Sequence, residues 1–211
     1  MIKGVLFDLD GTLIDTNELT YKSFLFMFKE IFDKELPKSE ITKFYGKPLE
    51  ESLSKFAEDD IMLNRMISTY RKYNKADHDS LCKVFDGVVE MLEKLKERNI
   101  KIAIVTSKKR DMAKRGLKVT NIFKYIDVII TPEDTTKHKP EGETAMKACE
   151  ILKLDPKEVL MVGDSPYDLM CGKNAGTLCC GVEYTEIDLS ELMRVKPDYM
   201  IKKPIDLLEV I

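Results

Sequence analysis

Asp8 and Asp10 follow directly after a short apolar run in the stretch VLFDLDGTLIDT, residues 5–16. Carboxylates at the end of a buried strand are costly to desolvate unless a cation lies beside them. Side chains two residues apart at a strand end can point to the same side. One carboxylate can then attack a phosphorus atom while the other exchanges protons with the leaving group and with water. The pair alone is a weak signal, but it suits phosphoryl chemistry at a site that also holds a cation, and the rest of the chain must supply the other groups.

Further polar side chains follow later apolar runs of the chain. These are Thr106 and Ser107 after residues 101–105, Lys139 in the segment TTKHKPEGE, and Asp164 and Asp168 in the segment GDSPYD. The reactive site of an open parallel sheet lies beyond the carboxyl ends of its strands. We therefore expect these side chains to converge on the first aspartate pair.

The converging set suits a hard cation with oxygen ligands. Mg²⁺ takes one or two protein carboxylates, keeps several waters and binds substrate phosphate. Zn²⁺ would need histidine or thiolate ligands, and the chain has two histidines and no paired cysteine spacing. We therefore expect Mg²⁺ and leave the choice between Mg²⁺ and Mn²⁺ open. Gly11 is expected to let the backbone pass close to the phosphoryl oxygens and offer its N–H groups.

The composition excludes several other classes of protein. The 211 residues are 44% hydrophobic and 34% charged, which suffices for one α/β domain, with or without a modest insert. The net charge is −3 and the positive residues are scattered, so we expect no nucleic-acid partner. No run approaches the roughly 18 apolar residues of a membrane span, and Asp8 interrupts the first run too early for a signal peptide. Five cysteines without framework spacing favour a reducing, cytoplasmic setting.

Strand-like apolar runs alternate with helix-like patterns, which predicts a parallel sheet covered on both faces. The expected strands are residues 3–7, 101–106, 125–130, 158–163 and 177–182, with a weaker one at 197–201. Residues 17–81 show helical patterns only, and no crossover between parallel strands needs so much chain. We therefore expect an all-helical cap domain at 17–81, inserted into an α/β core domain of residues 1–16 and 82–211. Hinges are expected near 15–17 and 81–85.

Two features inside the insert lead to local predictions. Phe24, Phe28 and Phe32 stand at helical spacing, so we expect them to form the apolar core of the insert. The last helix of the insert is expected at 60–74, and the dipeptide His78–Asp79 is expected to form a turn near the second hinge.

Taken in order, four motifs resemble those of the haloacid dehalogenase superfamily of phosphotransferases. They read FDLDGTLIDT, IAIVTSK with Thr106, HKP with Lys139, and MVGDSPYDL. The resemblance covers essentially the whole chain. It implies a Rossmann-like α/β core, a helical cap inserted after the first motif, Mg²⁺ and a phosphoaspartyl intermediate.

The resemblance also implies a role for each acidic residue of these motifs. Asp8 would be the nucleophile and the first metal ligand. Asp10 would be the general acid and base and would give the metal its backbone carbonyl. Asp164 would be a metal ligand, and Asp168 would support the metal shell. All four are therefore candidate metal-site residues.

Two further residues would hold the phosphoryl group according to the resemblance, namely Thr106 and Lys139. The superfamily usually has a proline two residues after the Lys-Pro pair, where this chain has Gly142. That departure leaves Lys137 as an alternative to Lys139.

Within the superfamily the chain is most similar to bacterial inorganic pyrophosphatases, a group that also resembles phosphoglycolate phosphatases. The resemblance implies a small phosphorylated substrate, with pyrophosphate ahead of phosphoglycolate or a sugar phosphate. A phosphomutase, or a non-catalytic binding protein on the same scaffold, remains as a further alternative. The oligomeric state is left open.

The residues expected to bind substrate are Gly11, Thr12, Lys47, Ser107 and Lys108. Pyrophosphate requires cations for its second phosphate as well as its first. Lys108 is the preferred candidate, because its place in the chain puts it at the same sheet edge as Thr106. Other candidates in the insert are Arg65, Arg71, Lys72 and Lys75.

Overall fold

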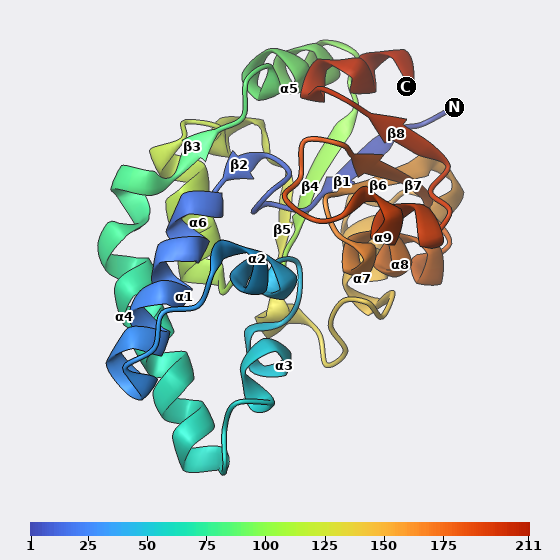
Figure 1. Cartoon of the computed structure of the whole chain (residues 1–211). Coiled ribbons are helices and arrows are strands. Elements are labelled where there is room, and N and C mark those ends of the chain that lie inside the picture. The colour runs from blue at the N-terminus through green and yellow to red at the C-terminus, as the bar shows by residue number, and fades with distance from the viewer.

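The computed structural model describes residues 1–211 and contains a six-stranded, fully parallel sheet (Figure 1). Its strands run in the spatial order β5-β4-β1-β6-β7-β8. Their bounds are β1 Gly4–Phe7, β4 Lys101–Val105, β5 Val128–Ile130, β6 Val159–Gly163, β7 Leu178–Val182 and β8 Tyr199–Ile201. The chain steps outward from β1 in both directions, so the strand order reverses beside β1. The α/β fold class is thus confirmed.

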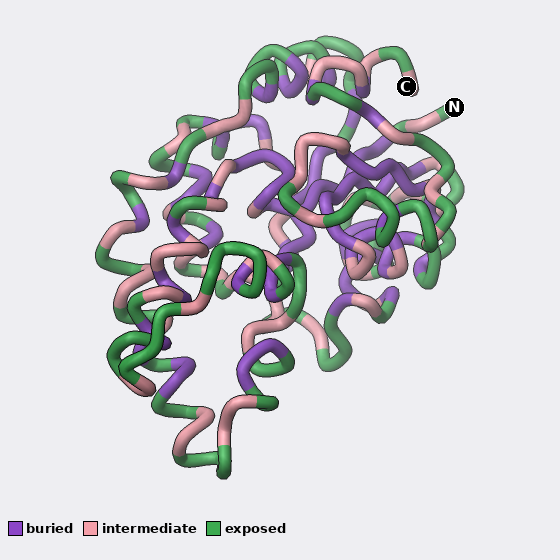
Figure 2. Tube along the Cα trace, in the orientation of Figure 1, coloured by how far each residue is buried: buried purple, intermediate pink, exposed green.

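Helices cover both faces of this sheet. Helices α5 (Val88–Glu97) and α6 (Arg110–Val119) pack on one face, and α7 (Glu143–Leu152) and α8 (Pro166–Ala175) pack on the other. Alternate residues of β1 pack on opposite faces of the sheet: Val5 and Phe7 belong to the apolar cluster on one face, and Leu6 belongs to the cluster on the other. Burial on both faces explains why the strands read as continuous apolar runs. Figure 2 shows the buried residues gathered along these central strands.

Short elements complete the core. Helix α9 (Leu189–Arg194) follows β7, and 3₁₀ turns lie at η2 Phe123–Tyr125, η3 Pro132–Asp134, η4 Pro156–Glu158 and η5 Pro204–Glu209. Strand β5 begins later than the expected residue 125. Residue 125 belongs instead to the turn η2, and Asp127 contacts Ile102 twice at 2.8 Å: its backbone N–H donates to the Ile102 carbonyl, and its carboxylate accepts the Ile102 backbone N–H. None of the helices has the length and apolar character that crossing a membrane would require.

Residues 17–81 form only helices. These are α1 Asn17–Phe32, α2 Lys38–Ile41, η1 Thr42–Phe44, α3 Leu49–Ser54 and α4 Asp60–Leu81. They have an apolar cluster of their own, in which Phe24 and Phe28 are buried and Phe32 is partly buried. The two segments that connect the insert to the core lie side by side, because β2 (Ile14–Asp15) pairs antiparallel with β3 (Lys83–Val84). Figure 1 shows α1 and α4 side by side, apart from the sheet.

Helix α4 extends seven residues beyond its expected end, from 74 to 81, so the expected turn at His78–Asp79 is wrong. The polar end of α4 is stabilised by contacts with α6. Arg115 Nε pairs with Asp79 Oδ1 at 2.7 Å, and Arg115 Nη1 donates to the carbonyl of Lys75 at 3.0 Å. His78 is completely buried, with Nδ1 3.0 Å from Asp79 Oδ1. These tertiary contacts outweigh the weak helical periodicity of the segment.

Candidate active site

Three adjacent strands end beside the candidate site. Strands β4, β1 and β6 are neighbours in the sheet, and Thr106, Asp8 and Asp164 follow their last residues directly. Because the three strands are parallel and in register, their carboxyl ends lie at one edge. The strand ends therefore bring these three residues of the predicted site to one edge of the sheet.

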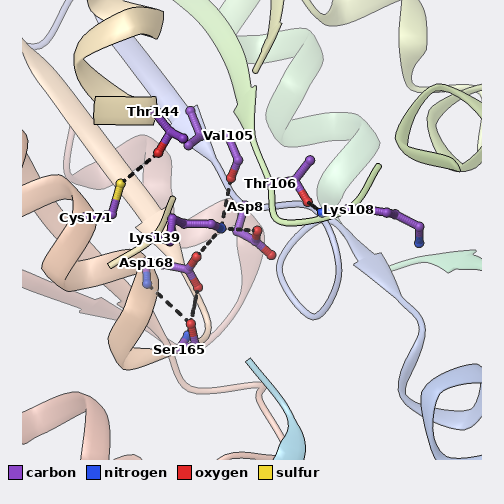
Figure 3. Close-up of polar contacts among 9 residues, drawn as sticks. All are labelled: Asp8, Val105, Thr106, Lys108, Lys139, Thr144, Ser165, Asp168 and Cys171. Carbon is purple, nitrogen blue, oxygen red and sulfur yellow. Dashed lines mark hydrogen bonds and ion pairs between the residues drawn. The ribbon is translucent and has the colours of Figure 1, made fainter. Parts of the chain in front are cut away.

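Three carboxylates form a buried cluster at this edge. One oxygen each from Asp8, Asp164 and Asp168 lies within 4.8 Å of the others, and the residues are 7%, 7% and 2% exposed. Lys139 Nζ lies 2.5 Å from Asp8 Oδ1 and 2.5 Å from Asp168 Oδ1. It also donates to the carbonyl of Val105 at 3.0 Å. Figure 3 shows the lysine reaching between the two aspartates, with all its donor capacity used.

Asp168 is held by the start of helix α8. Ser165 is the N-cap residue, and its hydroxyl and backbone N–H donate to Asp168 Oδ2 at 2.6 and 3.1 Å. This capping box follows from the spacing of serine and aspartate in GDSPYD. Gly163 allows the close approach, because a Cβ there would lie 2.2 Å from the Cβ of Asp168. Both oxygens of Asp168 thus have protein donors.

The pKa values of the cluster reflect an excess of buried negative charge. Burial raises the pKa of Asp8 to about 7; Lys139 opposes this rise, and the charges of Asp168 and Asp10 add to it. Burial, Asp168 and Asp8 together hold the pKa of Asp164 well above its usual range. Burial disfavours the Lys139 ammonium, but the neighbouring Asp168 and Asp8 outweigh it and raise its pKa.

The donor set fits a hard divalent cation. Three carboxylates against one ammonium leave two unbalanced negative charges in the buried cluster, which is the charge that a divalent ion carries. Every candidate ligand atom is an oxygen, as Mg²⁺ prefers. Burial and the neighbouring charges of Asp168 and Asp8 raise the pKa of Asp164, as expected for crowded carboxylates whose charge a cation would balance.

The Asp10 side chain lies outside this cluster and is held separately. Lys108 Nζ donates to Asp10 Oδ1 at 2.7 Å, and the Thr16 hydroxyl donates to the same oxygen at 3.0 Å. The Asp10 side chain is 33% exposed and that of Lys108 is 12% exposed. The Thr16 contact was not predicted from the sequence, and Lys108, which was expected to bind substrate, pairs here with the aspartate.

The residues expected to bind phosphate occupy different environments. Thr106 is buried, and its hydroxyl accepts the backbone N–H of Lys108 at 3.1 Å, whereas Ser107 is exposed. Thr12 is completely buried, and its side-chain hydroxyl has no protein partner. The N–H of Gly11 itself donates to the carbonyl of Ile14 at 2.8 Å, and contacts between the neighbouring backbone and a phosphoryl group stay a prediction.

Two structural requirements explain why a glycine stands at position 11. Its φ of 85° is in the left-handed region that side chains rarely adopt. A Cβ at this position would also lie 2.4 Å from Asp164 Oδ2. Gly11 therefore permits the approach of a candidate metal ligand.

Lys139 rather than Lys137 lies in the site. Lys137 is exposed, and its backbone N–H donates to Glu143 at 2.9 Å. Gly142, which stands in place of the usual proline, packs tightly: a Cβ there would lie 2.6 Å from the backbone nitrogen of Ala175. The close packing of the start of α7 on the end of α8 thus accounts for the glycine.

The insert contacts the site through the loop after η1. Gly46 has a φ of 71°, and a Cβ there would lie 2.5 Å from the Cβ of Ser165. Lys47 follows it and is exposed. Tyr167 of α8 donates to Glu51 of α3 at 2.5 Å, a second contact that the sequence analysis missed. The remaining candidate cations of the insert are exposed along α4, namely Arg65, Arg71, Lys72 and Lys75.

Comparisons with known proteins agree with this architecture. A family model described as haloacid dehalogenase-like hydrolase matches residues 5–182. The chain is 54% identical over 211 residues to a Clostridium perfringens protein provisionally named pyrophosphatase PpaX, covering 100% of this chain and 98% of that one. It is 38% identical over 210 residues to pyrophosphatase PpaX of Bacillus cereus, covering 100% of this chain and 96% of that one.

A solved structure of a haloacid dehalogenase-like family hydrolase from Streptococcus pneumoniae has a TM-score of 0.90 to this chain at 25% identity. The alignment covers 99% of this chain and 98% of that one. With the family model and these relatives, the protein belongs to the haloacid dehalogenase-like hydrolases. Within that family it is an enzyme of the phosphatase and pyrophosphatase class, which hydrolyses phosphoric ester or anhydride bonds.

Proposed function

We propose that the protein is a Mg²⁺-dependent inorganic pyrophosphatase that works through a phosphorylated Asp8. The observation that carries the proposal is the buried cluster of Asp8, Asp164 and Asp168, with Lys139 paired to two of them at 2.5 Å. A cluster with so much buried negative charge is costly unless a ligand uses it. Pyrophosphate is preferred among substrates because the relatives at 54% and 38% identity carry the name pyrophosphatase.

In the first step an oxygen of Asp8 attacks one phosphorus atom of pyrophosphate. The new bond joins that oxygen to phosphorus, and the bond from this phosphorus to the bridging oxygen breaks. Asp10 donates a proton to the bridging oxygen as inorganic phosphate leaves. Thr106 holds the phosphoryl oxygens together with Lys139, which gives up its bond to Asp8 as that oxygen attacks, and the lysine reduces the repulsion between two anions.

In the second step water hydrolyses the aspartyl phosphate. Asp10, now ionised, takes a proton from the water, whose oxygen attacks phosphorus. The bond between phosphorus and the Asp8 oxygen breaks, which releases the second phosphate and restores both aspartates. Lys108 and Thr16 keep the Asp10 carboxylate in place for both proton transfers, since both donate to its Oδ1.

Asp8, Asp164 and the backbone carbonyl of Asp10 would hold Mg²⁺. The ion supplies electrostatic stabilisation of the charge that develops on the transferred phosphoryl group. Asp168 has protein donors on both oxygens, so we assign it to the support of Lys139 and of the metal shell.

Residues 17–81 act as a cap over a core of residues 1–16 and 82–211 in this proposal. The β2–β3 pair lies where the chain enters and leaves the insert, which suits a hinge. Closure would exclude water and strengthen the electrostatic interactions at the site. Lys47, beside the Gly46–Ser165 contact, would bind the second phosphate together with Lys108. The five cysteines are all free and buried, which supports a cytoplasmic setting.

A phosphate-release panel tests the substrate. We expect kcat/KM for pyrophosphate with Mg²⁺ to exceed that for phosphoglycolate or glucose 1-phosphate by about tenfold or more. Two phosphates should form per pyrophosphate, and EDTA should stop the release. An Asp8→Asn protein purified in the same way controls for contaminating phosphatases. A preference for phosphoglycolate would overturn the substrate, whereas hydrolysis of none of these compounds would favour a binding protein.

A further inference from the structure

Residues 184–187, the four-residue segment after β7, lie outside all the motifs that suggested the site. Tyr184 donates from its hydroxyl to the carbonyl of Thr12 at 3.1 Å. Thr185 donates from its hydroxyl to Asp164 Oδ2 at 3.1 Å. The segment thus contacts both the loop after β1 and the candidate metal ligand after β6.

The Thr185 hydroxyl is oriented by a second hydrogen bond. It accepts the backbone N–H of Ile187 at 3.0 Å, so its own proton is free to point at the carboxylate. On the other side of the Asp164 carboxylate lies Gly11. A Cβ added to this glycine would be only 2.4 Å from Asp164 Oδ2, so no side chain fits there. The Asp164 carboxylate is therefore held between the Gly11 backbone and the Thr185 hydroxyl.

The same segment also contacts the insert. Lys38 Nζ of α2 lies 3.3 Å from both carboxylate oxygens of Glu186. Ile187 packs against the apolar cluster of the insert. It also lies close to Gly46, since a Cβ added to that glycine would be 2.9 Å from Ile187 Cδ1. Two consecutive residues beside Thr185 are thus positioned by helices and loops of the insert.

We propose that Thr185 is a positioning residue for Asp164, and that docking of the insert on Glu186 and Ile187 fixes Thr185 for this task. The segment 184–187 thereby couples the position of the insert to the affinity for the divalent cation. This inference rests on the proposed function, because it takes Asp164 as a ligand of Mg²⁺. Partners that hydrogen-bond to a metal ligand typically contribute about 10- to 100-fold to metal affinity.

The first experiment measures Mg²⁺ binding to the substrate-free protein by isothermal titration calorimetry. Thr185→Val removes the hydroxyl at nearly constant volume, and we expect it to raise the Kd for Mg²⁺ about 10- to 100-fold. Thr185→Ser keeps the hydroxyl and should stay within about threefold of the wild type. Thr177→Val is the matched control, since Thr177 is buried before β7 and its hydroxyl has no protein partner.

The outcomes separate this inference from the proposed function. If the wild-type protein binds no Mg²⁺, the proposed function fails together with the inference. If the wild type binds Mg²⁺ and Thr185→Val binds it equally well, only the inference fails. A loss of affinity in Thr185→Val that Thr185→Ser does not rescue also overturns it.

A second experiment tests the coupling with Lys38→Met. If Lys38 acted only through its charge, removing that charge near a cation site should leave the Mg²⁺ affinity unchanged or increase it. The coupling predicts the opposite, a weakening of up to about fivefold, which is the limit for an exposed ion pair. Lys43→Met removes the same charge from a pair confined to the insert, Lys43–Glu40, and should not weaken binding.

The double variant completes this test. In the Thr185→Val background, Lys38→Met should produce no further weakening, because the hydroxyl that transmits the effect is absent. Tighter or unchanged binding in Lys38→Met alone, or additive losses in the double variant, would overturn the coupling.

Discussion

The two sides of the candidate site are built in different ways. On the sheet side, Asp8, Lys139 and Asp168 are nearly fully buried and joined by contacts of 2.5 Å. On the insert side, Lys47 is exposed, and the Lys38–Glu186 pair has side chains 57% and 39% exposed. The groups proposed for chemistry are thus held rigidly by the core. The groups proposed for substrate selection lie on the insert, the part of the chain for which closure is proposed.

The physical cost of each side explains this difference. A buried lysine between two carboxylates is stable only while all its partners are present. An exposed ion pair contributes little, so breaking one during the proposed closure would cost little free energy. The difference leads to ordered expectations: substitutions on the sheet side should abolish activity or stability, and substitutions on the insert side should change affinity.

The largest effect is expected for Asp8→Asn. An amide cannot form the aspartyl phosphate, so turnover of pyrophosphate should fall by about 10⁴-fold or more. Steady-state phosphate release measures the loss, and circular dichroism checks that the variant is folded. Acid-quenched wild-type protein should carry phosphate on Asp8, and the variant should not. Turnover within about tenfold of the wild type would remove Asp8 from the role of nucleophile.

Lys139→Met should have the next largest effect, on stability. It leaves Asp8 and Asp168 buried without their ammonium, so the free energy of unfolding should fall by about 3–5 kcal/mol in the absence of metal. Urea unfolding measures this change. Lys137→Met is the matched control two residues away, and as an exposed site it should change stability by less than about 0.5 kcal/mol. Equal effects at the two positions would contradict the assignment of Lys139.

Lys47→Ala tests the insert side. The loss of one charged contact to the second phosphate should raise KM for pyrophosphate about tenfold and leave kcat nearly unchanged. Lys43→Ala is the control, because Lys43 is exposed on the insert, pairs there with Glu40 and is not among the candidate substrate cations. A large fall in kcat for Lys47→Ala would mean that the insert takes part in the chemistry, and the contrast between the two sides would then fail.

The smallest effect concerns pH. The pKa of Asp8 is raised from 3.8 to about 7 in the folded protein, so the folded state binds its proton more tightly. Its contribution to stability is complete below about pH 4 and is lost as pH rises through about 7. In the proposed function Mg²⁺ would replace that proton, so it should raise Tm by more at about pH 8 than at about pH 5.5. An equal Tm shift at both pH values, or the same pH dependence in Asp8→Asn, would contradict this.

The sequence by itself predicted the sheet and the site residues that follow its strands. Asp8, Thr106 and Asp164 each come directly after an apolar run, and the ends of adjacent parallel strands must meet. Helix α4 shows the limit of this reasoning. Its end at Leu81 depends on Arg115 of α6, which no local pattern in α4 contains.

Only the tertiary structure decided which side chains pair. Lys108 meets Asp10 across 98 residues of chain, and Thr185 meets Asp164 from a loop without a motif. It also separated Lys139 from Lys137, since both follow the same strand and only one is buried against Asp8. Hydrophobic periodicity and strand order determine the helix, strand or strand end at which a residue lies. The partner of a polar side chain depends on how loops and helices from distant segments pack around it, and the sequence does not encode that packing locally.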